Sequence, residues 1–178
     1  PLATFIRHPY HRVYSGFIPV QRDLERQRQV PFPADWIRDL VFKQLEENQA
    51  QLLRADCDFD RWVAGLTEDQ IRCVGRNTSL PLHPVHYWTH LRGEQHVSFV
   101  GRVEDFERDL SSFCHRVNVA LPPPINRNIS GDSVVSAGTY RHTAMMNAAS
   151  IDKINNLFLD DFTLFGYRII GNRNHIRG

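Results

Sequence analysis

Cysteine is scarce in this sequence, with three residues among 178. Cys57, Cys73 and Cys114 do not have the spacing of metal ligands. The odd number argues against a complete disulfide framework, but it leaves a Cys57–Cys73 pair open. A hydrophobic content of 42% is enough for a core without such a framework.

Long apolar runs and an excess of one charge are also missing. No stretch is long enough to span a membrane, so we expect a membrane anchor only outside these residues. Lys and Arg number 21 and Asp and Glu number 20, and a net charge of +1 gives no overall field to recruit nucleic acid. The length, without repeat or linker, predicts a single domain over residues 1–178.

The most informative stretch is a short apolar run that ends in Arg7. Residues 3–7 predict a strand, and residues 9–22 predict a helix with Pro9 in its first turn. This junction can hold an anion, because Arg is a forked, permanent cation and a helix N-terminus adds partial positive charge and free amides. Helical spacing places Ser15 opposite the apolar face. There its hydroxyl can meet the Arg7 guanidinium at one phosphate, whereas a solvated serine is the alternative on spacing alone.

These residues resemble the 3′-phosphate-binding motif of sulfotransferases, which use 3′-phosphoadenosine 5′-phosphosulfate (PAPS) as donor. The matching positions are Arg7, Pro9, Arg12, Ser15 and the pair Gly16-Phe17. The resemblance implies that Arg7 and Ser15 grip the 3′-phosphate and that Arg12 belongs to the same nucleotide site. It is closest to the carbohydrate-modifying branch, Golgi-type and bacterial, which often has Asp where this chain has His8.

A second junction of the same kind covers residues 97–118. Residues 97–100 predict a buried strand and residues 103–118 predict an amphipathic helix, with Arg102 between them. The stretch is similar to the "VGRxE" junction of the same family. If the two strands are parallel, Arg7 and Arg102 lie on one carboxyl edge of the sheet, where α/β proteins bind ligands. Arg102 is therefore a candidate nucleotide ligand, and its pairing with a nearby acid is the alternative.

Four later segments resemble family signatures and appear in the family's order, at residues 58–63, 77–88, 121–126 and 160–167. In the second segment, His83 and Pro84 match a degraded "H-x-x-P-Q" pattern, which makes His83 a candidate acceptor-binding residue. Arg141 follows a loop predicted at residues 119–135 and is a candidate nucleotide contact, with a surface arginine as the alternative. The resemblance implies an α/β fold, a P-loop-like three-layer sandwich with a small parallel sheet flanked by helices.

Three histidines near this second segment have a spacing of three and four residues, which one helix face can present to a metal. They are His83, His86 and His90. Pro84 and two bulky aromatics argue against an orderly ligand face. The aromatic pair Tyr87-Trp88 is able to stack on a sugar ring, although aromatics more often fill a core.

Asp58 is expected to cap a short helix that ends near Leu66, and towards the C-terminus Ser150 is expected to cap a final helix. Residues 80–91 are ambiguous between helix and strand.

A Gly-rich, Lys-containing loop for the 5′-phosphosulfate does not occur in the sequence, which begins almost inside a strand. We therefore expect the family's first strand, phosphate loop and catalytic base before Pro1, and the catalytic residue is left unassigned. The resemblance implies transfer of a sulfuryl group from PAPS, without a metal, to a hydroxyl of a carbohydrate or similar acceptor.

Two alternatives to this function stay open. They are a P-loop kinase-like enzyme that handles ATP and a degenerate domain that binds a glycan or protein without turnover. The sequence does not fix the compartment, which is the cytoplasm for a bacterial enzyme and the Golgi lumen for a eukaryotic one.

Overall fold

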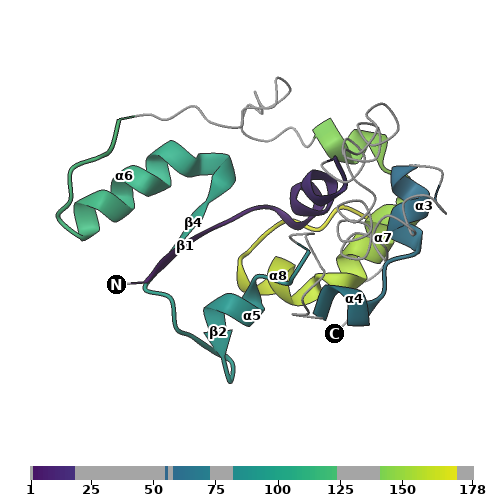
Figure 1. Cartoon of the computed structure of the whole chain (residues 1–178), viewed down its shortest axis with the longest axis horizontal. Coiled ribbons are helices and arrows are strands. Elements are labelled where there is room, and N and C mark those ends of the chain that lie inside the picture. Colours follow the sequence, from purple (N-terminus) through teal and green to yellow (C-terminus); the bar gives the residue numbers. More distant parts are fainter. Residues whose placement is uncertain (1, 19–54, 56–57, 73–81, 124–140, 172–178) are drawn as a thin grey trace, which may run out of the picture.

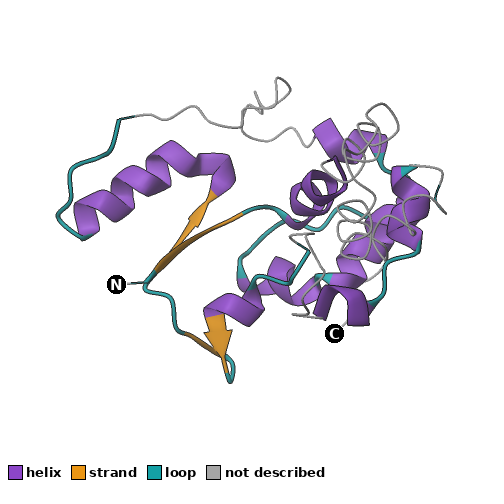
Figure 2. Cartoon of the chain, in the orientation of Figure 1, coloured by secondary structure: helices purple, strands orange, loops and turns teal. Residues whose placement is uncertain are grey.

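The computed structural model describes residues 2–18, 55, 58–72, 82–123 and 141–171 (Figure 1). Within these residues there are two small sheets. Strands β1 (Ala3–Ile6) and β4 (Phe99–Arg102) form a parallel pair, and β2 (His90–Leu91) and β3 (Glu94–Gln95) form an antiparallel hairpin. The structure thus has the expected mixed α/β class with a small parallel sheet beside helices (Figure 2).

The parallel pairing predicted from the two strand–helix junctions is confirmed. Ala3 is the partner of Phe99, and Ile6 is the partner of Arg102. Arg7 directly follows Ile6, so Arg7 and Arg102 lie on the same carboxyl edge, as expected. The strand predicted at residues 97–100 begins two residues later, because the pairing with β1 starts at Phe99.

Helix α6 (Phe106–Arg116) follows β4 through a 3₁₀ turn, η1 (Val103–Asp105), and lies beside the parallel pair (Figure 1). The helix predicted at residues 103–118 is therefore confirmed in position but starts with a tighter turn. Phe5 packs on Phe106 with ring centroids 4.8 Å apart, and Phe99 packs on Phe113 at 5.2 Å. These aromatic contacts join the pair of strands to α6.

Gly101 lets these rings approach the backbone of β4. A Cβ atom at this position would lie 2.5 Å from Cε1 of Phe5 and 3.0 Å from Cε1 of Phe99. Both distances are shorter than a van der Waals contact, so a larger residue must displace the rings. Gly101→Ala is expected to lower the free energy of unfolding by about 1–3 kcal/mol, measured by urea denaturation.

Gly65→Ala is the matched control for Gly101→Ala. Gly65 has a right-handed backbone conformation (φ −79°), and an added Cβ would lie 3.5 Å from the nearest atom, the Trp62 carbonyl oxygen. The alanine therefore fits without strain and also restricts the unfolded chain. Equal losses of stability in the two variants would contradict the close packing described for Gly101.

The core lies among a group of five further helices. They are the first helix (residues 9–18), α3 (Phe59–Ala64), α4 (Glu68–Arg72), α7 (Ala148–Leu157) and α8 (Leu159–Leu164). The apolar face predicted for the first helix is confirmed, since Tyr10, Val13 and Phe17 are buried there. They pack in one cluster with Trp62 of α3 and Ile154 of α7. This packing fixes the first helix, and with it the position of Ser15.

Two predicted helix caps had different outcomes. Asp58 caps α3 as expected, and its Oδ1 accepts a hydrogen bond from the Arg61 amide at 2.8 Å. The prediction for Ser150 was wrong, because Asn147 caps α7 and accepts from the Ser150 amide at 2.8 Å. Asn is as good an N-cap as Ser, and it precedes two alanines that favour a helix. The helix therefore starts at Ala148 and buries Ser150 in its first turn.

Residues 80–91, which were ambiguous from the sequence, include a short helix α5 (His86–Thr89) that runs into β2. Arg92 and Gly93 turn the β2–β3 hairpin with positive φ angles of 53° and 84°. Strands of two residues give no periodic signal, which is why the hairpin was not predicted.

Several sequence predictions lie outside the described residues. They concern residues 19–22 of the helix predicted at residues 9–22, a further helix that the sequence predicts near residues 34–47, and the pairing of Cys57 with Cys73. Cys114 is described, and it is a buried free thiol. None of the helices in the described ranges has the length and hydropathy needed to cross a bilayer.

Candidate functional site

Arg7 and Ser15 meet at the carboxyl edge of β1. The Arg7 Nη1 atom donates a hydrogen bond to the Ser15 Oγ atom at 2.6 Å, and both side chains are partly buried. Arg carries several further N–H donors, and a serine hydroxyl that accepts a bond keeps its own proton to donate. The two side chains can therefore direct several donors at one anion. The sequence placed both residues at one phosphate, and the structure brings them into direct contact.

The start of the first helix is held by a carboxylate from the second junction. Glu104 Oε1 accepts a hydrogen bond from the His8 amide at 2.7 Å, and the Tyr167 hydroxyl donates to Glu104 Oε2 at 3.3 Å. The His11 Nδ1 atom lies 3.9 Å from Glu104 Oε1. A negative charge is favourable at this end of a helix. The expectation that the amides here are free for an anion is therefore wrong for His8.

His8 itself is a neutral core residue. Its side chain is 1% exposed, and its ring lies 5.0 Å from Tyr10, 4.7 Å from Tyr167 and 5.5 Å from Phe162. Burial, followed by the nearby His11, lowers the pKa of His8 to about 3. The imidazole is therefore uncharged near neutral pH and contributes packing rather than charge to the junction.

Arg102 anchors the C-terminal part of the chain to the end of β4. Its Nη2 atom donates to the Phe165 carbonyl oxygen at 2.7 Å, and its guanidinium lies 4.8 Å from the Tyr167 ring centre. The Arg102 amide donates to Asp109 Oδ2 at 2.7 Å. Arg102 lies on the expected sheet edge, but its side chain contacts protein groups there. These contacts give it a structural role that the ligand hypothesis did not include.

Arg12 forms a buried ion pair with Asp161 of α8. Its Nη2 atom lies 2.5 Å from Asp161 Oδ2, and the two residues are 8% and 1% exposed. The guanidinium also lies 4.9 Å from the Phe158 ring centre. The charge of Arg12 is therefore directed at a core carboxylate. Asp161 is 149 residues away in sequence, so the sequence around Arg12 gave no sign of this partner.

Asp161 accepts hydrogen bonds from three further donors. The Val85 amide lies 2.8 Å from Oδ2, and Oδ1 receives the His86 amide at 3.0 Å and the His86 Nδ1 atom at 2.8 Å. Burial alone would raise the pKa of Asp161, but the Arg12 charge and the two amides together hold it below its ordinary value. Asp161 is thus an ionised group that ties α5, α8 and the first helix together.

Comparison with known proteins identifies the family of this chain. A family model described as "Sulfotransferase family" matches residues 2–168, which include both strand–helix junctions and Asp161. The chain belongs to the sulfotransferase family. Neither the curated proteins nor the solved structures gave a match. Enzymes of this family pass a sulfuryl group to an acceptor, so the chain is related to transferases.

The remaining predicted residues of this sulfotransferase chain are scattered. His83 is partly buried with its ring against Trp88, at 5.9 Å between ring centres. His90 Nδ1 lies 2.8 Å from the Thr89 hydroxyl, whereas His86 binds Asp161. Across the described parts of the chain, no group of three or more His, Cys, Asp or Glu side chains is arranged to hold a metal.

Arg141 is the first residue of the 3₁₀ helix η2 (Arg141–Met145). The structure of this sulfotransferase chain does not describe where its side chain lies, so its predicted contact with the nucleotide is still a prediction.

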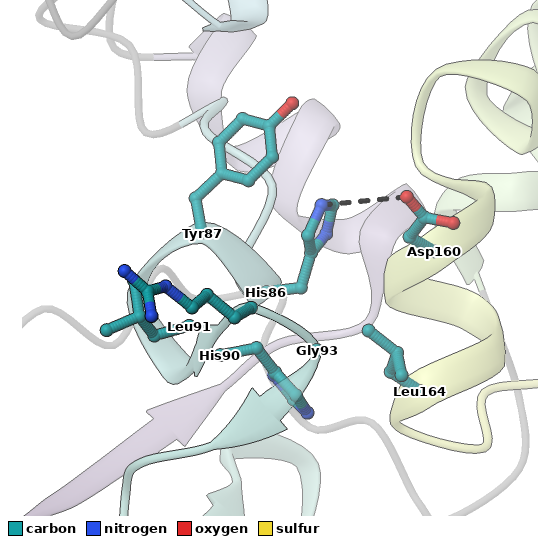
Figure 3. Close-up of a pocket in the computed structure, with 8 residues that line it drawn as sticks. His86, Tyr87, His90, Leu91, Gly93, Asp160 and Leu164 are labelled. Carbon is teal, nitrogen blue, oxygen red and sulfur yellow. Dashed lines mark ion pairs between the residues drawn. The ribbon is translucent and has the colours of Figure 1, made fainter.

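The sulfotransferase chain has a pocket of about 490 Å³ between α5, the β2–β3 hairpin and α8 (Figure 3). Its lining consists of His86, Tyr87, His90, Leu91, Arg92, Gly93, Asp160 and Leu164. The sequence analysis identified neither this pocket nor the role of Asp161. The position of Asp161 directly before Phe162, which is buried, was a usable signal. A carboxylate in such a position needs partners, because a buried charge is costly when unpaired.

Proposed function

We propose that this chain carries the nucleotide-gripping part of a sulfotransferase that uses PAPS and modifies a hydroxyl of a carbohydrate. The observation that carries the proposal is the 2.6 Å contact between Arg7 and Ser15 at the end of β1. A charged fork beside a hydroxyl suits a phosphate monoester such as the 3′-phosphate of PAPS. The family supports sulfuryl transfer in general, and the donor and the acceptor class are the proposed part.

Arg7 and Ser15 would bind the end of the donor that does not react. In sulfuryl transfer, the acceptor oxygen bonds to sulfur while the bond from sulfur to the 5′-phosphate breaks and adenosine 3′,5′-bisphosphate (PAP) leaves. Holding the 3′-phosphate orients the donor for this step and lowers its entropic cost. The developing charge on the sulfuryl group must be stabilised by other donors. Arg7 and Ser15 are therefore positioning groups for the nucleotide.

The P-loop-like, three-layer architecture belongs to the same proposal. Parallel strands in α/β proteins bind ligands at their carboxyl ends, and β1 and β4 are paired in parallel. Arg12 and Arg102 are left out of the proposed grip, because Asp161 and the Phe165 carbonyl oxygen occupy them. Their contacts keep the helix and the sheet edge that carry Arg7 and Ser15 in place.

Arg7→Ala is expected to weaken the binding of PAP by about 1.5–3 kcal/mol, roughly 10- to 150-fold, since a charged hydrogen bond is lost at a partly buried site. Ser15→Ala is expected to cost about 1 kcal/mol, because a hydroxyl is a neutral donor that water can partly replace. Titration calorimetry of the full-length protein with PAP measures both losses.

Adenosine 5′-phosphosulfate, which lacks the 3′-phosphate, is the control ligand, and both variants should bind it like the unsubstituted protein. Arg116→Ala, at an exposed position at the end of α6, is the control variant and should leave PAP binding unchanged. Equal losses for the two nucleotides, or no loss for either, would remove Arg7 and Ser15 from the nucleotide site.

A further inference from the structure

One carboxylate joins the two strand–helix junctions. Glu104 lies in the 3₁₀ turn η1 that follows β4, and its Oε1 atom accepts a hydrogen bond from the His8 amide at 2.7 Å. The His11 Nδ1 atom lies 3.9 Å from the same oxygen. His8 directly precedes the first helix and His11 lies in its first turn. Glu104 therefore reaches from the end of β4 to the start of the helix that follows β1.

The contact with His8 restricts the backbone of Arg7. The His8 amide belongs to the peptide group that joins Arg7 to His8, and a peptide group is planar. A hydrogen bond that holds this plane also holds the backbone on one side of the Arg7 Cα atom. The pairing of Ile6 with Arg102 holds the other side. The direction in which the Arg7 side chain leaves the backbone thus depends on Glu104.

The contact with His11 acts on the helical turn before Ser15. His11 is four residues before Ser15, so the two side chains lie on neighbouring turns of the same helical face. His11 is 7% exposed and close to the Glu104 carboxylate. Glu104 is therefore next to the residue that follows Arg7 and next to the residue one turn before Ser15, the two side chains that meet at 2.6 Å.

Glu104 is itself held by the C-terminal part of the described chain. The Tyr167 hydroxyl donates to Glu104 Oε2 at 3.3 Å. The Tyr167 ring lies 4.7 Å from the His8 ring, and the Arg102 guanidinium lies 4.8 Å from the Tyr167 ring centre. These contacts fix the tyrosine against both junctions. The carboxylate is thus bound through both of its oxygens.

The charge of Glu104 is unfavourable for an anion nearby. A carboxylate close to a phosphate site repels the phosphate, so on charge alone Glu104 would weaken binding. The side chain is 25% exposed, and water therefore screens part of this repulsion. An acid at this position can assist phosphate binding only through the geometry that it imposes. Charge and geometry therefore predict opposite effects when Glu104 is replaced.

We propose that Glu104 is a positioning residue for the nucleotide, because it holds the backbone so that Arg7 and Ser15 converge on the 3′-phosphate. This inference rests on the proposed function. Glu104 acts without touching the nucleotide, and it raises affinity by keeping the arrangement of Arg7 that binds phosphate populated. The effect is limited to ligands that carry the 3′-phosphate.

Titration calorimetry of the full-length protein with PAP and with adenosine 5′-phosphosulfate tests the proposal. Glu104→Ala is expected to lower PAP affinity by roughly tenfold, since Arg7 then samples arrangements that do not bind phosphate. The affinity for adenosine 5′-phosphosulfate should not change. Glu107→Ala is the control, because it removes an exposed acid from the first turn of α6, and it should not lower PAP affinity.

Glu104→Gln separates the geometry from the charge. Glutamine keeps an oxygen that can accept the hydrogen bond from the His8 amide, but it carries no charge. PAP affinity should therefore return to that of the unsubstituted protein or exceed it, because the repulsion is gone.

Combining Glu104→Ala with Arg7→Ala distinguishes positioning from a general contribution to the fold. If Glu104 acts through Arg7, its replacement should cost little further PAP affinity once Arg7 is absent. A residue with a purely structural role would lower PAP affinity by the same factor in both backgrounds.

Three results would overturn the role of Glu104 and leave the proposed function intact. They are unchanged or tighter PAP binding in Glu104→Ala, equal losses for the two nucleotides, and the same loss with and without Arg7. Glu104→Asp keeps the charge on a shorter side chain and should show the same selective loss, so it decides the matter if the alanine variant does not fold. Failure of both variants to fold would make Glu104 structural and also overturn the proposal. No loss of PAP affinity in Arg7→Ala would instead overturn the proposed function.

Discussion

Arg12→Ala is expected to lower the free energy of unfolding by about 3–5 kcal/mol, because the substitution leaves the buried Asp161 carboxylate without its cation. Asp161 is 1% exposed, and the two charged groups lie 2.5 Å apart, so water cannot replace the lost partner. Removing Arg12 also removes its contact with the Phe158 ring. Urea denaturation, which does not screen charges, measures the loss.

Arg108→Ala is the control for Arg12→Ala. Arg108 also has carboxylate partners, Asp105 at 2.8 Å and Asp109 at 2.9 Å, but its side chain is 67% exposed. Exposed ion pairs contribute little, because water and salt screen them. We expect no measurable change in this variant. If Arg12→Ala also left the free energy of unfolding unchanged, the Arg12–Asp161 pair would be solvated. The anchoring of α5 by Asp161 would then need another explanation.

Acid is expected to destabilise the protein from about pH 6.5 downwards because of His8. The pKa of His8 is 6.5 when exposed and about 3 in the folded protein. Between these values the unfolded chain binds a proton that the folded protein does not bind, so stability is full above the unfolded pKa and falls as the pH is lowered. Each pH unit costs about 1.4 kcal/mol, and the loss down to the folded pKa is of the order of several kcal/mol.

His8→Phe separates this titration from the titration of other groups. Phenylalanine keeps the ring contacts with Tyr10 and Tyr167 and the amide bond to Glu104, but it cannot bind a proton. Urea denaturation at several values between about pH 7 and pH 4 should give a flatter slope for this variant than for the unsubstituted protein. Parallel slopes would mean that His8 accepts a proton in the folded protein.

The features that the sequence predicted are those that neighbouring residues determine. The apolar run before Arg7, the proline after it and the helical spacing of Tyr10, Val13 and Phe17 were enough to place the first junction. The same reasoning placed the second junction, and the preference of parallel strands for one ligand-binding edge joined the two. The Arg7–Ser15 contact follows from this local geometry, since the residues are eight positions apart.

The roles of Arg12 and Arg102 could not be predicted, because their partners are distant in sequence. Arg12 is paired 149 residues away with Asp161, and Arg102 is bonded 63 residues away to the Phe165 carbonyl oxygen. An arginine looks the same in a sequence whether it binds a ligand or a core carboxylate. Only the packing of α8 against the first helix distinguishes the two, and this packing also creates the His86–Asp161 pair.

The separation in sequence of the paired strands also bears on how the chain folds. His8 and Glu104 are 96 residues apart, whereas Arg7 and Ser15 are eight apart. Closing the longer loop costs roughly 2 kcal/mol more chain entropy than closing the shorter one, and contacts of such long range form slowly. The first helix can bring Arg7 and Ser15 together early. We therefore expect Arg7 and Ser15 to meet before β4 pairs with β1 during folding.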